Sequence, residues 1–410
     1  MERYERYKDS GVKWIGEIPG HWGMYKLKYL FKLNKNKNIG NKCNTILSLS
    51  YGKIKIKKDL NEGLTPESYE SYQLLSTGDI VIRSTDLQND HTSLRTGLVK
   101  IEGAITSAYI GLKNLDMSLC DSRFYHYFLH DWDITKAIYN QGKGLRQSLN
   151  WDDIKNMLIP VLDISEQTAI ANYLDSTTAK IDEAIAQQQK MIDLLNERKQ
   201  IIINNAVTKG LNPDAPMKDS GVDWIGEIPE HWMTRRMRYL CKIKTGDKDT
   251  INRVDEGKYP FYVRSPKVER INSYTFDGEA VLMAGDGVGA GKVFHYVNGK
   301  FGCHQRVYIF HDIKNINGEY LYFYMKSLFK HTIEQLSAKS TVDSVRLNMI
   351  QDFIVAIPTN EEQTSILSYL HKQIEKFDVA IANATKQISL LQERKQIIIN
   401  DVVTGKVKVS

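Results

Sequence analysis

Two loops rich in glycine and serine carry basic side chains that could bind a polyanion. They read "QGKGLRQSLN" (141–150) and "SAKSTVDSVRLN" (337–348). Lys and Arg suit contact with phosphate, while Arg and Gln can make paired hydrogen bonds to the edge of a base. For any one of these residues the alternative is a plain surface turn. The candidates in the two loops are Lys143, Arg146, Gln147, Lys339, Ser340 and Arg346.

Further polar side chains lie where predicted strands end. In the first half, "TGDIVIRST" (77–85) and "GAITSAYIGLK" (103–113) each predict a strand. In the second half, "DGEAVLMAGDG" (277–287) and "KFGCHQRVYIFH" (300–311) follow in the same order. Side chains at strand ends can reach base edges, so these positions are candidates for DNA contact. They are Arg83, Ser84, Thr85, Ser107, Tyr109, Arg264, Asp286, His304 and Gln305.

The segment "AGDGVGAGK" (284–292) resembles a nucleotide-binding loop in its glycine spacing. A phosphate-binding loop must open a helix, because the helix N-terminus supplies the N–H groups that hold the phosphate. The next residues, "VFHYV", predict a strand. Nucleotide binding is therefore disfavoured, and a tight loop that faces the backbone of a ligand fits better.

Metal binding and catalysis find little support in the sequence. Cys303 and His304 would point to opposite faces of a strand, which argues against a metal site with the nearby His295 and His311. There is no GxSxG, HExxH or NPPY-type motif. The charged triplets 197–199 and 393–395 fall in predicted helices, where alternating charges are typical of a solvent-exposed helix face. We expect a recognition module; a coiled-coil scaffold and an enzyme with an unrecognised site are the alternatives.

These candidate residues are carried by a frame that the chain contains twice. "KDSGVKWIGEIPGHW" (8–22) returns as "KDSGVDWIGEIPEHW" (218–232), at an offset of 210 residues. "EQTAIANYL" returns as "EQTSILSYL", and "NERKQIIINNAVT" as "QERKQIIINDVVT", at an offset of 196. "LNWDDIKNMLIP" (149–160) matches "LNMIQDFIVAIP" (347–358) at 198. We expect the second middle region to be about a dozen residues shorter, with two more residues lost after the IP pair.

Two long helices are predicted downstream of the EQT motifs. Apolar residues recur in two interleaved seven-residue series, and no Pro or Gly interrupts 166–209 or 361–404. About 40 residues would form a rod of roughly 60 Å. We expect the helices to pack on each other as an antiparallel pair; the alternative is that each folds back on its own domain. The predicted seam is Leu174, Ile181, Ile185, Ile192, Leu195, Ile202, Leu370, Ile374, Phe377, Ile381, Ile388, Leu391 and Ile398.

The sequence thus predicts a mixed α/β (α+β) fold. Two pseudo-repeated globular domains, each with strands and an aromatic-rich helix, are separated by two long antiparallel coiled-coil helices. The expected boundaries are a first domain at 1–160, a first long helix at 161–209, a linker at 210–217, a second domain at 218–358, a second long helix at 359–404 and a tail at 405–410.

Composition agrees with a protein that meets a polyanion. The 410 residues carry a net charge of +6, and His21 to Leu60 contains ten lysines but a single acid, Asp59. A lysine-rich solvated surface explains that stretch equally well. No apolar run is long enough to span a membrane, and the four cysteines are scattered. We expect a cytoplasmic protein with reduced thiols and no membrane contact.

The duplicated "SGVxWIGEIPxHW", "LN…IP" and "EQTxI…YL…ERKQIIIN" motifs, in this order, are features of a known family. The chain resembles the specificity subunit of Type I restriction–modification systems over essentially its whole length. The resemblance implies that each globular domain is a target recognition domain that reads one half of a bipartite double-stranded DNA target. The segments around Trp14 and Trp224 would then seat these domains on the helices.

The same resemblance implies what the partners do. The helices would set the spacer between the half-sites and dock two modification (methyltransferase) subunits, and restriction/translocase subunits would join the complex. S-adenosylmethionine, ATP and Mg are expected on those partners, and no cofactor on this chain. The chain would be non-catalytic by itself, although a Type I restriction endonuclease and adenine-specific methyltransferase complex would require it.

Overall fold

The chain divides into two compact units, which are described one at a time. The computed structural model describes residues 2–57, 68–88, 94–139, 148–337 and 344–409. The first unit comprises residues 1–188 and 386–410, and the second comprises 189–385. Both unit boundaries fall inside long helices, so each unit contains one globular domain and a stretch of each long helix.

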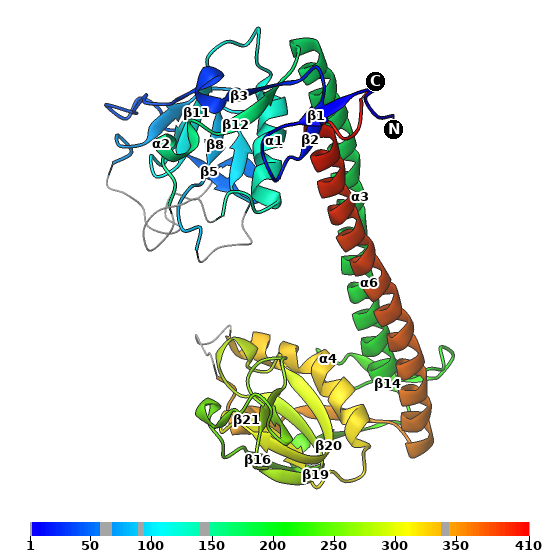
Figure 1. The fold of residues 1–410 in the computed structure, drawn as a ribbon. Helices are drawn as coiled ribbons and strands as arrows, with labels where there is room; N and C mark the ends of the chain where they lie inside the picture. The colour runs from blue at the N-terminus through cyan, green and yellow to red at the C-terminus, as the bar shows by residue number, and fades with distance from the viewer. Residues whose placement is uncertain (1, 58–67, 89–93, 140–147, 338–343, 410) are drawn as a thin grey trace. The chain divides into compact units, whose positions relative to one another are not determined.

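The first unit is built around a four-stranded antiparallel sheet in the order β4-β11-β8-β9, and α1 lies against β9 (Figure 1). Its main core includes Trp22 and Trp132, both fully buried. Asp121 caps α1 by accepting a hydrogen bond from Arg123 N. The elements are β1 Tyr7–Asp9, β2 Glu17–Pro19, β3 Gly23–Lys26, η1 Leu27–Tyr29, β4 Phe31–Leu33, β5 Leu47–Ser50, β6 Lys53–Ile56, β7 Gln73–Leu75, β8 Ile80–Ile82, β9 Thr96–Leu98, β10 Gly103–Ile105, β11 Ile110–Asn114, α1 Ser122–Ile134, α2 Trp151–Ile154 and β12 Leu158–Val161.

The second unit holds a mixed six-stranded sheet in the order β16-β21-β19-β20-β17-β18, in which only β17 and β20 run parallel. α4 lies against β19 and β20 (Figure 1). The elements are β13 Met217–Asp219, β14 Glu227–Pro229, β15 Met233–Arg236, η2 Met237–Tyr239, β16 Lys242–Thr245, η3 Thr250–Asn252, β17 Tyr259–Tyr262, β18 Glu269–Ile271, β19 Phe276–Ala284, η4 Gly287–Gly289, β20 Phe294–Cys303, β21 Val307–His311, α4 Gly318–Ser337, α5 Leu347–Gln351 and β22 Ile354–Ile357.

Two expected strands are each broken in two. The single strand predicted at 103–113 is β10 and β11, which belong to different sheets. The break follows from the side-chain amide of Gln73, which donates to the carbonyls of Thr106 and Tyr109 and so satisfies backbone groups that leave the ladder. The strand predicted at 300–311 is likewise β20 and β21, with a turn between them.

The register of the short frame sheets corrects the predicted alignment of the two halves. Pro160 in β12 pairs with Met24 in β3, whereas Ala356 in β22 pairs with Thr234 in β15. Met24 and Thr234 are equivalent at the offset of 210, so Pro160 corresponds to Ala356, at 196 rather than 198. The prediction of a two-residue loss after the IP pair was therefore wrong. The sequence alignment had matched the LN and IP dipeptides of the two halves, although they are not equivalent in the fold. The pairing of backbone groups between strands establishes which residues are equivalent.

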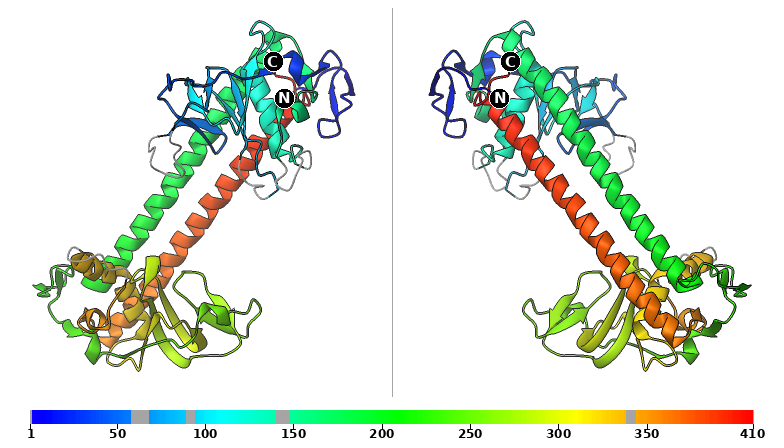
Figure 2. Two further views of the ribbon diagram at one scale, coloured as in Figure 1. Left: turned by 90° about the vertical axis from the view of Figure 1, so that its left-hand side faces the viewer. Right: turned by 90° about the vertical axis from the view of Figure 1, so that its right-hand side faces the viewer.

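The two long helices are α3, Ile164–Lys209, and α6, Asn360–Val403, close to their predicted limits. Within each unit they run antiparallel (Figure 1 and Figure 2). In the first unit Lys395 Nζ lies 2.6 Å from Asp182 Oδ1, and in the second Lys199 Nζ lies 2.6 Å from Asp378 Oδ1. The prediction of an antiparallel helix pair is confirmed.

Each long helix begins in the core of its own domain, as the alternative supposed, but ends in the core of the other unit. Leu174 and Val402 belong to the core of the first unit, and Val207 and Leu370 to that of the second. The remaining seam positions between these ends are buried or half-buried. Each helix therefore has a seam in its middle and domain contacts at its ends, since neither surface alone would bury all its apolar side chains.

Candidate nucleic-acid interface

In the globular domain of the second unit, three strand ends bring the predicted candidates together. Tyr262, the last residue of β17, accepts a hydrogen bond through its carbonyl from His304 N, in the turn between β20 and β21. Gly285, which follows β19, donates its N–H to the carbonyl of Arg306 in that turn. These backbone bonds gather Arg264, Asp286 and the β20–β21 turn at one edge of the sheet.

Asp286 is the centre of this cluster. Its Oδ1 lies 3.2 Å from Arg264 Nη1, and its Oδ2 lies 3.1 Å from Arg306 Nη1. Arg306 was not among the predicted candidates. The sequence signal for it was present, because Arg306 directly follows Gln305, but a continuous strand was expected there and the turn was missed.

His304 and Gln305 support the cluster in different ways. His304 is buried, and its Nδ1 accepts a hydrogen bond from Arg306 N at 3.0 Å, which leaves the ring proton on Nε2. Burial, together with the nearby Arg264, lowers the pKa of His304, so it stays neutral. Gln305 is exposed and donates to Asp249 Oδ2 at 3.0 Å. His304 thus braces the turn from within, and Gln305 presents its amide at the surface.

The glycine-rich segment serves close backbone packing. A Cβ at Gly289 would lie 2.2 Å from the carbonyl oxygen of Arg264, and one at Gly285 would lie 2.8 Å from the ring of Tyr308. The segment leads into strand β20 and not into a helix. It therefore lacks the helix N-terminus that a phosphate-binding loop needs, in agreement with the sequence-based expectation.

In the first domain, a buried arginine organises the turn after β8. Arg95 is fully buried, and its guanidinium donates to the carbonyls of Arg83, Thr85 and Asp86 at 3.2, 2.8 and 3.1 Å. Ser84 is buried too, and its carbonyl accepts a hydrogen bond from Leu149 N. The side chains of Arg83 and Thr85 are half-buried. Arg95 was missed by the sequence analysis because nothing local marks an arginine that binds carbonyls from below.

The second predicted group in this domain lies on the turn between β10 and β11. Ser107 is exposed and donates to the carbonyl of Ser71 at 2.5 Å, while Tyr109 is half-buried. This turn corresponds to the β20–β21 turn of the second domain, because β11 and β21 occupy equivalent places beside β8 and β19. The two domains therefore present equivalent turns with different side chains.

Not all predicted candidates can be placed. Arg346 is exposed at the start of α5, next to Val345, whose N–H donates to the carbonyl of Gly285. Lys143, Arg146, Gln147, Lys339 and Ser340 lie outside the described residues.

The repeated tryptophan segment (8–22 and 218–232) joins each domain to both long helices. In the first unit, Trp22 Nε1 donates to Glu166 Oε1 at 3.2 Å, and His21 Nε2 lies 2.9 Å from Glu166 Oε2. Glu166 is in the first turn of α3. Gly405, just after α6, packs so closely that a Cβ there would lie 2.3 Å from Pro19. Trp22 therefore lies between the start of one helix and the end of the other.

The second unit repeats this arrangement with its own residues. Trp232 Nε1 donates to Glu362 Oε1 at 3.2 Å, and His231 Nε2 lies 3.0 Å from Glu362. Burial alone would raise the pKa of Glu362, but hydrogen bonds from Thr359, Trp232 and His231 hold it below its usual value. Gly210, just after α3, packs against the indole of Trp232. The sequence repeat is thus a structural joint made twice.

A buried glutamine completes each joint. Gln167 Oε1 accepts from Asp121 N at 2.9 Å, and its Nε2 donates to the carbonyl of Leu162 at 2.8 Å. Gln363 Oε1 accepts from Asn317 N at 2.7 Å, and its Nε2 donates to the carbonyl of Pro358. These amides tie the aromatic-rich helix of each domain to the start of a long helix.

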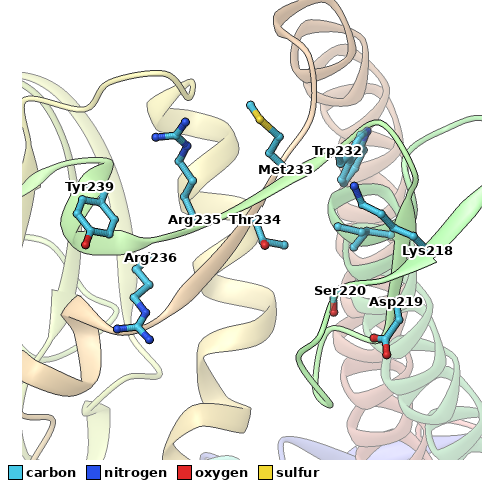
Figure 3. A pocket seen from close by; sticks show the side chains of 10 residues that line it. Lys218, Asp219, Ser220, Trp232, Met233, Thr234, Arg235, Arg236 and Tyr239 are labelled. Atoms are coloured by element: carbon cyan, nitrogen blue, oxygen red, sulfur yellow. The ribbon is translucent and has the colours of Figure 1, made fainter.

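A groove of about 650 Å³ opens beside the joint of the second unit (Figure 3). It is lined by the tryptophan segment, including Lys218 and Trp232, and by strand β15. Arg235 and Arg236 extend to opposite sides of that strand (Figure 3), as alternation along a strand requires. Among the described residues, none of the predicted DNA-contact candidates lines this groove. The groove therefore belongs to the repeated segments that carry the domain, and not to the strand-end cluster around Asp286.

Two further features concern the described residues only. Within them, no group of three or more His, Cys, Asp or Glu side chains is arranged to hold a metal ion. Among the same residues, no helix is both long and apolar enough to cross a membrane.

Comparison with known proteins agrees with this geometry. The family model described as "Type I restriction modification DNA specificity domain" matches residues 229–390. A Type I restriction enzyme EcoDI specificity subunit of Escherichia coli is 34% identical over 173 residues, which are 42% of this chain and 36% of that protein. A putative type I restriction enzyme MjaX specificity subunit of Methanocaldococcus jannaschii is 25% identical over 98% of both chains.

The fold is shared with a solved chain from work on complex assembly and conformational transition of the type I R-M system. That chain has a TM-score of 0.70 and 14% identity, over 95% of this chain and 99% of its own. Fold and frame define a duplicated protein, with two mixed α/β domains carried on paired helices. By these comparisons the chain is similar to the specificity subunits of Type I restriction–modification systems.

Proposed function

We propose that this chain recognises a bipartite DNA sequence, with one half read by each recognition domain. The observation that carries the proposal is a comparison of the two units. The joint between domain and helices is repeated with equivalent residues and nearly equal distances, whereas the side chains differ at the strand-end turns, which we call the reading edges. Equivalent joints place the two edges in equivalent ways, and different side chains at the edges give different base preferences. Basic residues would supply affinity through phosphate contacts that weaken as salt rises.

The long helices are proposed to fix the spacer between the half-sites and to dock two modification subunits. Leu194 and Ile201 on α3 are 51% and 44% exposed, and Leu390 and Ile397 on α6 are 47% and 51% exposed. Each pair is seven residues apart and therefore lies on one helix face. The pairs are related by the same 196-residue offset as the joints. Two equivalent apolar surfaces, one in each unit, suit two copies of one partner.

Chemistry is assigned to those partners. Modification subunits would bind S-adenosylmethionine, flip an adenine out of the duplex and methylate it. Restriction/translocase subunits would use ATP and Mg. This chain would work in the cytoplasm, bind no cofactor itself and contribute only the choice of sequence.

Methylome sequencing tests the proposal directly. A host with this gene and its modification-subunit gene is compared with the same host lacking only this gene. We expect a split adenine-methylated motif that disappears when the gene is removed. A motif that persists without the gene would contradict the proposal, and so would a purified complex that shows no sequence preference; a scaffold that joins proteins without touching DNA would then be the better description.

A further inference from the structure

The cluster around Asp286 has an unusual distribution of exposure. The side chain of Asp286 is only 18% exposed, whereas those of Arg264 and Arg306 are 47% and 62% exposed. One carboxylate therefore lies at the base, and the two guanidinium groups that it holds face outward.

Each guanidinium keeps most of its donors for a ligand. Arg264 and Arg306 each use Nη1 toward the carboxylate, and among the described residues their Nε and Nη2 groups have no further partner. A guanidinium is planar, so its free N–H groups point in one plane and match two acceptors side by side. In the major groove, guanine presents such a pair, O6 and N7.

We propose that Arg264 and Arg306 read guanine in the half-site of the second domain, and that Asp286 is the positioning residue for both. This deepens the proposed function and rests on it. The ligands are two G·C base pairs reached through the major groove, and each arginine makes a two-point hydrogen bond to the guanine of one of them.

The arrangement favours a base edge over a phosphate. Asp286 reduces the formal charge of the cluster from +2 to +1, and it would repel a phosphate that approached closely. Phosphate contact needs charge more than orientation, whereas a base edge demands a fixed plane.

The backbones that carry both arginines are fixed, which supports orientation as their purpose. Arg306 N donates to the buried His304, and the carbonyl of Arg306 accepts from Gly285 N at 2.8 Å. The carbonyl of Arg264 lies so close to Gly289 that no side chain would fit there. Ordering these groups before binding reduces the entropy lost on binding.

The first domain offers a built-in contrast. The carbonyl of Ser84 accepts from Leu149 N as that of Gly285 accepts from Val345 N, so Thr85 is equivalent to Asp286, and the strand registers then make Ala108 equivalent to Arg306. The first domain therefore lacks the carboxylate and one guanidinium at these positions, and the inference concerns only one half-site.

The test uses the full complex with modification subunits. Methylome sequencing first defines both half-sites, and binding is then measured to duplexes in which each base pair is replaced in turn. We expect Arg264→Lys and Arg306→Lys each to lower discrimination at one G·C pair of a single half-site by about 10–100-fold. Lysine keeps the charge and loses the planar fork. Asp286→Asn should weaken discrimination at both pairs.

The matched control is a second pair of arginines on one aspartate in the same unit. Arg236 Nη1 lies 3.2 Å from Asp352 Oδ1, and Arg238 pairs with the same carboxylate, but both belong to the frame. Arg236→Lys and Arg238→Lys should leave every base preference unchanged. The unaltered half-site reports in each variant that the complex is folded and bound.

Three results would overturn the inference while leaving the proposed function intact. The first is a second half-site made only of A·T pairs, and the second is full discrimination in both lysine variants. The third is a loss of affinity in the glutamine variants (R264Q, R306Q) that is the same for all sequences and comes with a shallower salt dependence. That result would indicate phosphate contact. Absence of any split motif in the wild type would instead refute the proposed function itself.

Discussion

In the first recognition domain, the turn after β8 is organised from below by the buried guanidinium of Arg95, which donates to three carbonyls. In the second, the equivalent turn places Asp286 beneath two exposed guanidinium groups. The arginine is the support in one domain and the presented group in the other. The joints below the two turns are nearly identical in residues and distances.

This contrast shows where a duplicated chain is free to change. The joint as a whole contacts both long helices, so a substitution there disturbs two helices and a domain core together. Side chains at the reading edge contact mainly their own turn and solvent, so they can change without effect on the frame. A recognition protein gains new specificity at such edges while its supports remain the same.

The largest expected effect tests whether the two joints are equivalent. Trp22→Ala and Trp232→Ala each remove a fully buried indole, so each should lower the stability of its own unit by about 3–5 kcal/mol. Hydrogen exchange, followed separately for amides of each domain, measures the loss. If one substitution loosens its domain and the other does not, the joints are equivalent in sequence but not in energy.

The next effect concerns the buried glutamines. Gln167→Leu and Gln363→Leu leave a buried carbonyl, that of Leu162 or Pro358, without its donor, and each should cost about 1–3 kcal/mol. Gln187→Leu is the control, because Gln187 is exposed and bonds only within its helix. Denaturant unfolding of the three variants gives the comparison, and losses no larger than the control's would remove these amides from the joint.

A third prediction uses a place where the domains differ. Asp131 in α1 accepts from Asn400 Nδ2 at 2.8 Å, and its equivalent in α4 is Ser327, bonded to Asn204. Burial raises the pKa of Asp131 to about 6. A raised carboxyl pKa favours the fold below the unfolded value of 3.8, and this contribution is lost as pH rises through 6. Asp131→Ser should therefore stabilise the first unit at pH 8, by about 1–2 kcal/mol.

The same variant should gain little or nothing at pH 4, where Asp131 is protonated in the folded unit. Unfolding measured at both values of pH checks the sign. The reverse change, Ser327→Asp, should make the second unit newly sensitive to pH over the same range. An equal gain from Asp131→Ser at pH 4 and pH 8 would mean that packing, and not ionisation, explains the difference.

The smallest expected effect lies in the helix pair. Double-mutant cycles should give about 0.2–1 kcal/mol for Lys395 with Asp182 and for Lys199 with Asp378, because all four side chains are partly exposed. Asp182→Asn alone should cost slightly more than Asp378→Asn, since Lys53 also lies 3.8 Å from Asp182. A coupling free energy that vanishes at high salt for both pairs would confirm the prediction. A coupling free energy well above about 1 kcal/mol would contradict it and indicate a salt bridge that is shielded from water.

Much of the frame could be predicted from the sequence. The limits of both long helices were found within three residues, because a seven-residue apolar repeat without Pro or Gly specifies a helix locally. The repeat also predicted two equivalent domains. The charged triplets were interpreted as decoration, yet Lys199 and Lys395 pair with aspartates of the other helix, which no single helix pattern reveals.

The reading edges were predicted only in part. Arg264, Asp286 and the β20–β21 turn do come together, but Arg306 was missed and His304 proved to be a buried brace. Strand breaks caused these errors: the break at 106–109 is held by the distant side chain of Gln73, and the one at 304–306 by the ring of His304, which accepts from Arg306 N. Such bonds leave no periodic signal in the sequence.

The helices and the duplicated frame could be derived from the sequence alone, because they depend on periodicity and on near-identical repetition, whereas the class of function came from the resemblance of these motifs to a known family. Only the tertiary structure decided that Pro160 corresponds to Ala356, that one carboxylate holds two arginines, and that Trp22 lies between the start of one helix and the end of another. Each of these depends on residues far apart in the chain, which come together only when backbone pairing and burial select one register.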